Sequence, residues 1–310
     1  MMVDGKEDDI NKLPTYTFDR SQAFATLPEA RIPVDKVTRR VFTKAGVLSE
    51  WLAWISPKLR GRIQSKIVKR QKAQPHLFHF SQKTFELLKA ELKEHVPESC
   101  NITISHILLA LVTETLVQAH AAVASRKSKN FLKFIKPRAK KDTLPMGIIF
   151  QTREQLKLAS TEYIGNVLMP KIVLKPLCEM ESSTTIESLA KGIIGFSKTV
   201  SAISAPLVAS YMDMIGSRPS SFTRPAMSFS FHKTAMTFVY DVMPDMYVAD
   251  FGYGRPVRVS PIEPFRANAV LLLTGSNPND GVDIFLSTFS EAMDEILKNE
   301  SWMSIVSKIY

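Results

Sequence analysis

The side chains whose types and spacing could do chemistry lie in two short motifs at opposite ends of the chain and in six histidines. Residues 250–254 read Asp-Phe-Gly-Tyr-Gly, and residues 1–5 read Met-Met-Val-Asp-Gly. In both motifs an aspartate stands close to glycine, which supplies backbone conformations that a side chain forbids. The histidines, none in a His-x-x-x-Asp context, are His76, His79, His95, His106, His120 and His232. The aspartates are candidate metal ligands or structural anchors, whereas no histidine stands in the context of a motif base.

The triplet Asp250-Phe251-Gly252 alone suggests a protein kinase, in which the aspartate binds magnesium. The rest of the sequence excludes this interpretation, because it has no glycine-rich phosphate loop, no Val-Ala-Ile-Lys strand and no His-Arg-Asp loop upstream. A Gly-x-Ser-x-Gly elbow, typical of hydrolases, is also missing from the sequence. Cys100 and Cys178 stand far apart in no ligand-like spacing, so we expect neither a metal site nor a disulfide framework.

Several further segments follow one another in a definite order along the chain. They are Phe18-Asp19-Arg20-Ser21, Ile104-Ser105 with Leu108 and Ala110, Thr152-Arg153, Tyr163-Ile164-Gly165-Asn166, Asp250–Gly254 with Pro256, Asp280-Gly281, and Glu291 and Met293 with Trp302. This order resembles the BAHD family of acyl-CoA-dependent acyltransferases, and within it the fungal branch that includes the trichothecene O-acetyltransferases. Each segment is short, so the resemblance rests on their collinearity.

Two family signatures are matched with departures. Asp250–Gly254 is similar to Asp-Phe-Gly-Trp-Gly, with Tyr253 in place of tryptophan. Met1–Gly5 resembles His-x-x-x-Asp-Gly, but its histidine would immediately precede Met1. The resemblance therefore implies that the chain is truncated at its N-terminus, and the codon upstream of Met1 tests this expectation.

The resemblance implies transfer of an acyl group, expected to be acetyl, from acyl-CoA to a hydroxyl of a secondary metabolite. In such a reaction an imidazole takes the proton of the attacking hydroxyl, and hydrogen-bond donors stabilise the oxyanion. Asp4 would be the orienting aspartate of the signature whose histidine is missing. Asp250, Phe251, Gly252, Tyr253 and Gly254 would form a structural loop on the CoA side. Arg153 would pair with Asp250, and Asn166 belongs to a matching strand. Acyl-CoA would be a co-substrate, with no bound cofactor or metal.

The elements that must position these residues alternate irregularly between strands and helices. Strands are predicted at 77–80, 146–150, 167–174, 227–239, 257–259, 269–274 and 282–288. Helices are predicted at 41–55 and 57–71, and a third follows a cap at Ser81. A strongly apolar helix is predicted from Thr103 or Ser105 to about Ala124. Residues 184–215 are predicted to be helical with a break at Pro206, and the last helix is predicted to begin at Ser290. A basic linker ending near Pro137 and Pro145 follows the Ala124 helix. This order predicts a mixed α/β fold.

The resemblance implies a chloramphenicol-acetyltransferase-like fold in a two-domain architecture from which most of the first domain is missing. Residues 1–75 would be the remnant of that domain with a crossover segment, and residues 76–310 would be the second acyltransferase domain. The 250–254 loop would lie near the domain junction. His79 and His232 fall in alternating, strand-like segments, so we interpret them as packing or surface residues.

The composition and charge of the chain indicate its cellular compartment and its binding partners. The chain has 45% hydrophobic residues and a net charge of +10, with seven Lys or Arg in residues 58–72 and eight in residues 126–141. Such charge attracts nucleic acid, anionic membranes or the phosphates of CoA. Uninterrupted apolar runs are shorter than the roughly 18 residues of a membrane span, and the charged N-terminus is unlike a secretory signal. We expect a cytoplasmic protein, monomeric when full-length, that binds acyl-CoA and an alcohol but neither nucleic acid nor membrane.

Three hypotheses remain open on the sequence alone. In the first, the protein is an acyl-CoA-dependent O-acyltransferase whose histidine lies upstream of Met1. In the second, these 310 residues form a non-catalytic remnant or partner-binding protein of the same fold. In the third, the basic runs bind nucleic acid.

Overall fold

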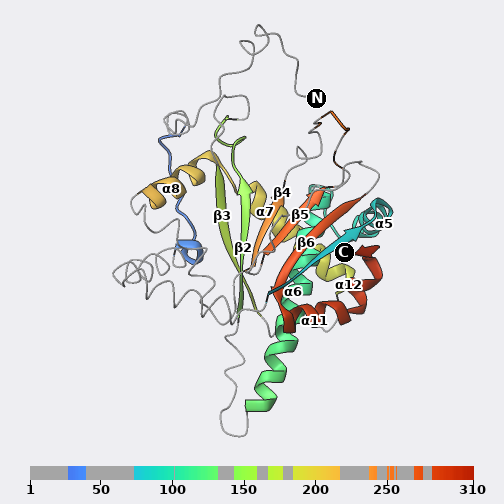
Figure 1. Cartoon of the computed structure of the whole chain (residues 1–310). Coiled ribbons are helices and arrows are strands. Elements are labelled where there is room, and N and C mark those ends of the chain that lie inside the picture. Colours follow the sequence, from blue (N-terminus) through green and yellow to red (C-terminus); the bar gives the residue numbers. More distant parts are fainter. Residues whose placement is uncertain are drawn as a thin grey trace.

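The computed structural model describes residues 27–39, 73–100, 102–131, 143–158, 167–176, 184–216, 237–242, 250, 252–254, 256, 269–274 and 281–310. Within these residues the predicted mixed α/β architecture is confirmed, since a seven-stranded sheet carries a layer of helices (Figure 1). The helices expected at 41–55 and 57–71 and the strand expected at 257–259 lie outside the described residues.

The sheet is mixed, and its strand order does not follow the chain. The strands are β1 Ala73–Phe80, β2 Thr143–Gln151, β3 Leu168–Pro176, β4 Thr237–Val242, β5 Ala269–Thr274, β6 Val282–Phe289 and β7 Lys308–Ile309. Their order is β3-β2-β4-β5-β6-β1-β7, with β2, β4 and β5 parallel and all other neighbours antiparallel. Strand β1 therefore lies between two strands from the C-terminal end of the chain.

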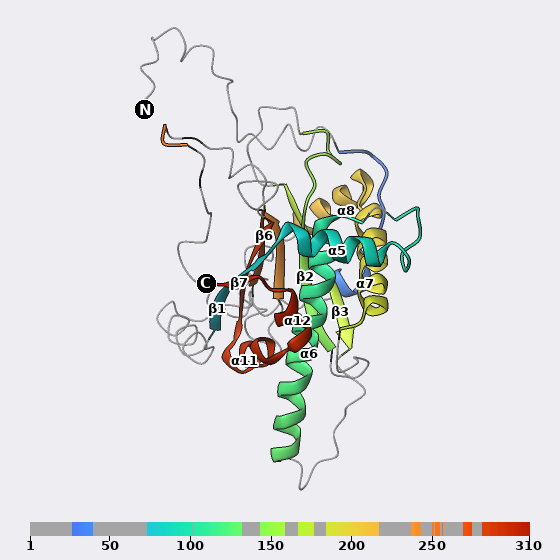
Figure 2. The ribbon, with the colours of Figure 1, turned by 90° about the vertical axis from the view of Figure 1, so that its right-hand side faces the viewer.

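The helices gather on one side of the strands (Figure 2). They are α5 Gln82–Leu92, α6 Ile104–Phe131, α7 Ile186–Ser201, α8 Ala205–Gly216, α11 Ser290–Lys298 and α12 Glu300–Ile305. The predicted cap is confirmed, because the Ser81 side chain accepts a hydrogen bond from the backbone N–H of Thr84 at the start of α5. The predicted interruption near Pro206 is also confirmed, since α7 ends at Ser201 and Pro206 lies in the first turn of α8, where proline is tolerated.

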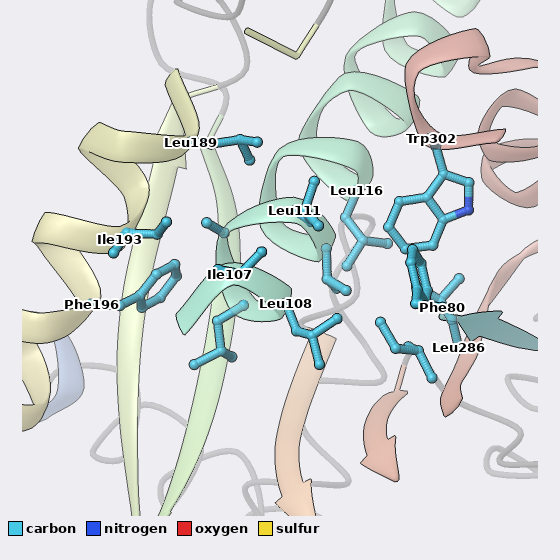
Figure 3. Close-up of a cluster of buried hydrophobic side chains, with 14 of the residues drawn as sticks. Phe80, Ile107, Leu108, Leu111, Leu116, Leu189, Ile193, Phe196, Leu286 and Trp302 are labelled. Atoms are coloured by element: carbon cyan, nitrogen blue, oxygen red, sulfur yellow. The ribbon is translucent and has the colours of Figure 1, made fainter. Parts of the chain in front are cut away.

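Helix α6 forms the centre of the hydrophobic core. Every residue from Ile107 to Val117 is buried, as expected for a helix that is apolar around its circumference. Figure 3 shows its side chains between those of α7 and an aromatic group that includes Phe80 and Trp302. The stretch Ile104–Arg126 is long and apolar enough to cross a membrane, but 72% of its apolar window is buried inside the protein. This burial is typical of a core helix.

Two polar side chains of α6, those of Glu114 and Gln118, form hydrogen bonds with its neighbours. The Ser188 hydroxyl of α7 donates to Glu114 over 2.8 Å. The Gln118 amide donates to the Thr184 hydroxyl over 3.3 Å and accepts from the Asn299 amide over 2.8 Å. These bonds join α6 to the starts of α7 and α12 and offset the cost of burying polar atoms.

Trp302 joins the C-terminal helix to β1. Its ring lies edge-on to Phe78 and Phe80, with centroid separations of 5.3 and 5.2 Å, and all three side chains are buried. Edge-to-face aromatic pairs contribute about 0.5–1.5 kcal/mol beyond the area that they bury. The inward-facing side of β1 is therefore fixed against the helical layer.

Three predicted boundaries are wrong. The helix that begins at Ser290 is not the last one, because Asn299 ends it and caps α12 by accepting from the Trp302 N–H over 2.9 Å. Helix α6 continues past Ala124 into the expected basic linker, where Arg126 forms an ion pair with Glu295 of α11.

Pro145 lies inside β2 and does not end the linker. The pairing of β2 with β4 begins only at Met146, so in the described pairing Pro145 has β3 alone as a neighbour. Proline lacks the N–H that a strand between two partners would use, and it is tolerated where only one partner is present.

The outer strand β3 is unsuited to further pairing. It lies at one end of the sheet order, and its residues include Pro170, Lys171 and Pro176. Proline and lysine are the residues that commonly protect sheet edges from pairing with other strands. At the other end, β7 has only two residues.

Gly281 sets the start of β6 against β1. Its φ is +91°, a conformation that favours glycine, and a Cβ here would collide with the carbonyl oxygen of Phe80 and approach the Gln82 backbone nitrogen to 2.9 Å. Val282 then pairs with Phe80. The register of the β1–β6 pair therefore requires glycine at position 281, because any side chain there would collide with the backbone of Phe80.

We predict that Trp302→Ala lowers the free energy of unfolding by about 3–5 kcal/mol, because it leaves a large cavity against Phe78 and Phe80. The measurement is urea unfolding of the purified protein with the m-value checked for constancy. Leu87→Ala is the control, since Leu87 on α5 is 63% exposed and its loss should change stability by no more than about 0.5 kcal/mol. Equal effects of the two substitutions would contradict the core assignment.

We also predict that Gly281→Ala destabilises the protein more than Gly254→Ala does. Both glycines have a φ of +91°, but a Cβ at Gly254 meets no atom within 4 Å, whereas at Gly281 it meets backbone. The shared conformational cost cancels in the comparison, and the collision should add about 1–3 kcal/mol at position 281. Paired thermal and urea melts measure the difference, and equal stabilities would show that the backbone at Gly281 relaxes freely.

Candidate functional site

The 250–254 motif forms a turn that closes on its own aspartate. One carboxylate oxygen of Asp250, Oδ1, accepts hydrogen bonds from the Gly252 N–H over 2.7 Å and from the Gly254 N–H over 3.0 Å. Both glycines have positive φ, +92° and +91°. The sequence pattern follows directly, because the carboxylate needs two nearby donors and the backbone must curl through conformations that favour glycine. Phe251 lies outside the described residues.

Tyr253 projects from this turn with 97% of its surface exposed. The aromatic residue at this position therefore does not pack into the core of the described structure. A ring held on a turn that is closed by two hydrogen bonds is available to contact a ligand or another part of the protein.

Arg153 lies in the turn that follows β2. Its Nη1 donates to the carbonyl oxygen of Leu158 over 3.3 Å, and the Leu158 N–H donates back to the Arg153 carbonyl over 2.8 Å. The hydroxyl of Thr152 donates to the carbonyl of Val167 over 3.0 Å. The structure thus brings the Thr152-Arg153 segment beside the residue that follows Asn166.

Some predicted site residues lie outside the described part of the chain. They are Asp4, Asn166 and His232. Asp250 and Arg153 each bond to backbone atoms of their own turns, and the ion pair between them stays a prediction. In the described turn, Asp250 holds the backbone of its own loop, and its role in the family site stays a prediction.

The described histidines have different surroundings. His95 is exposed in a turn, whereas His120 is buried on α6 and lies edge-on to Phe289 at 6.3 Å between centroids. Burial lowers the pKa of His76 in β1, because desolvation disfavours its charged form.

His79 has a partner that the sequence did not reveal. Its Nδ1 lies 2.7 Å from Oδ1 of Asp283, the residue directly opposite on β6. Both residues stand in strands that the sequence predicts, but only the register between those strands, fixed at Phe80 and Gly281, makes them neighbours. The sequence alone therefore could not predict the contact between His79 and Asp283.

No curated protein matches the chain, but a protein family and several solved structures do. A model of the Transferase family matches residues 115–303. TRI101 of F. sporotrichioides, complexed with coenzyme A and T-2, is 16% identical with a TM-score of 0.55, over 76% of this chain and 51% of that chain. TRI101 of F. graminearum, complexed with coenzyme A and deoxynivalenol, is 14% identical with a TM-score of 0.57, over 76% of this chain and 49% of that chain.

The chain thus spans about half the length of these solved structures. At such identities the likeness shows the fold, which is the predicted chloramphenicol-acetyltransferase-like α/β fold. The family match covers more than half of the chain and includes both the Asp250–Gly254 turn and Trp302. This chain belongs to the Transferase family, the BAHD-type acyltransferases.

Proposed function

We propose that this protein is an acyl-CoA-dependent O-acyltransferase that moves an acyl group, expected to be acetyl, to a hydroxyl of a small secondary metabolite. The observation that carries the proposal is the Transferase family match over residues 115–303. The similar TRI101 structures hold coenzyme A together with T-2 or deoxynivalenol, which supports a thioester donor and a small-molecule acceptor.

The Asp250–Gly254 turn has a defined role in this proposal. It would support the CoA side of the active site by holding a fixed backbone shape and presenting Tyr253. Asp250 acts there as an anchor, because its Oδ1 already accepts from two N–H groups of the same turn. Residues 76–310 would form the acyltransferase domain of a cytoplasmic protein that is monomeric when full-length.

A second candidate function is a non-catalytic, partner-binding protein of the same fold. The observation that favours it is Tyr253, an aromatic side chain that is 97% exposed on the Asp250–Gly254 turn and accessible to a partner. Both candidate functions assume the same fold, but only the O-acyltransferase is expected to turn over acyl-CoA.

The deciding experiment incubates the purified protein with acetyl-CoA and a panel of alcohols that includes deoxynivalenol. A thiol reagent measures released CoA, and mass spectrometry detects the acetylated product. We expect CoA release that depends on the alcohol. CoA binding without product would favour the partner-binding function, whereas absence of both would overturn the proposed enzyme.

We predict that Asp250→Ala weakens CoA binding about tenfold, because two N–H groups of the turn lose a charged acceptor worth about 1–2 kcal/mol. Asp250→Asn should retain most of the affinity, since its amide oxygen can accept both bonds. Calorimetric titration with CoA measures the effect.

Asp294→Ala is the control for this prediction, because it removes the same charge from an exposed position on α11. If Asp250→Ala binds CoA as tightly as the control variant, the turn does not support the CoA side.

A further inference from the structure

A second, smaller cluster of apolar side chains lies beside the core around α6. Its buried members come from the turn that follows β2, from β3, and from α8 with the residues before it; they are Leu156, Leu158, Met169, Ile203, Val208 and Tyr211. Burial raises the pKa of Tyr211, because desolvation disfavours its charged form. This second cluster is therefore a closed apolar unit near the β3 end of the sheet.

Residues 27–39, here called the strap, lie against α8 and cover part of the second cluster (Figure 1). The half-buried side chains of the strap that pack against the cluster are Leu27, Val34 and Val37. The Ile32 N–H donates to the carbonyl of Pro206 at the start of α8 over 3.4 Å, while the Ile32 side chain is 47% exposed. The strap is thus held by side-chain packing and by a long hydrogen bond to the first turn of α8.

An ion pair fastens the strap to the other end of α8. Nε of Arg31 lies 2.6 Å from Oδ2 of Asp213, and the two side chains are 39% and 57% exposed. Nη1 of the same guanidinium donates to carbonyl oxygens within the strap, those of Pro28, Glu29 and Ala30. An ion pair with this exposure contributes little free energy and is screened by salt. Opening of the strap should therefore respond to ionic strength.

The second cluster also holds the turn that carries Arg153. Leu156 and Leu158 are 1% and 0% exposed, and Lys157 between them has a φ of +54°. A residue with a side chain keeps such a conformation only where the surrounding structure imposes it. The Leu158 carbonyl accepts from Nη1 of Arg153 over 3.3 Å, so the guanidinium is placed by a turn whose leucines lie in the second cluster.

We propose that the strap is a salt-sensitive latch that controls the order of the Arg153 turn. In the closed state the strap, α8 and the two leucines form one apolar unit that keeps Lys157 in its strained conformation. When the Arg31–Asp213 pair opens and the strap lifts, the second cluster loses packing and meets water. The turn then relaxes, and Arg153 loses its support at Leu158. Such order–disorder coupling links a surface contact to a distant side chain.

Hydrogen exchange at single amides, read by NMR, compares the wild type with Asp213→Asn, which keeps the size of the side chain and removes its charge. The amides of Ile32, Leu158 and Ile107 report on the strap, the turn and the core around α6, and each donates to a backbone carbonyl. At low ionic strength, exchange at Ile32 and Leu158 should be about two- to fivefold faster in the variant, the change expected for one exposed ion pair. Exchange at Ile107 should stay the same. Added salt should bring the wild type to the rates of the variant, because it screens the pair.

Two further variants control for the loss of charge itself. Asp294→Asn removes the same charge from an exposed carboxylate on α11 and should exchange like the wild type. Arg31→Asp places two carboxylates side by side and should speed exchange at Ile32 further than Asp213→Asn does. Adding Asp213→Arg to Arg31→Asp restores an ion pair of opposite direction and should recover part of the lost protection.

The outcomes separate the latch from its effect on the turn. Unchanged exchange at Ile32 in Asp213→Asn overturns the latch. Faster exchange at Ile32 with unchanged exchange at Leu158 overturns the coupling between the strap and the Arg153 turn. An equal increase at Ile107 shows opening of the whole domain and overturns a local device. All of these readouts are independent of turnover, so they stand or fall separately from the proposed acyltransferase.

Discussion

The packing of Trp302 against Phe78 and Phe80 is the contact on which the C-terminal half of the sheet depends. The two phenylalanines occupy alternate positions of β1, so their burial decides which face of that strand is inside. Everything on the other face follows from this choice, including the position of His79 beside Asp283. One tryptophan near the end of the chain thus orients residues more than two hundred positions earlier.

Helix α6 imposes the second constraint. A helix buried on all sides must satisfy its polar side chains inside the protein, and Glu114 and Gln118 do so through Ser188, Thr184 and Asn299. These partners stand at or beside the starts of α7 and α12. Glu114 and Gln118 of α6 are therefore bonded to the starts of the neighbouring helices, while its apolar residues supply the burial.

Local signals in the sequence predicted much of this arrangement. The strand at 77–80, the Ser81 cap and the strand that follows Gly281 each rest on a few adjacent residues. The Asp250–Gly254 turn could also be predicted as an anchor, because its donors and acceptor lie within the same five residues.

The remaining features depend on contacts between distant segments. Asn299 both caps α12 and bonds Gln118. Pro145 is tolerated in β2 because the described pairing with β4 begins only at Met146. The pairing of His79 with Asp283 needs a register that no local pattern encodes.

The proline-containing edge strand β3 has a consequence for how this half-length domain meets other chains. A strand from a second molecule cannot continue the ladder where Pro170 and Pro176 offer no N–H, and β7 at the opposite edge is too short to template one. Within the described residues, both borders of the sheet are therefore poor templates for strand exchange or fibril growth. Exposed turns, such as the one that carries Tyr253, are better surfaces for contact with a partner.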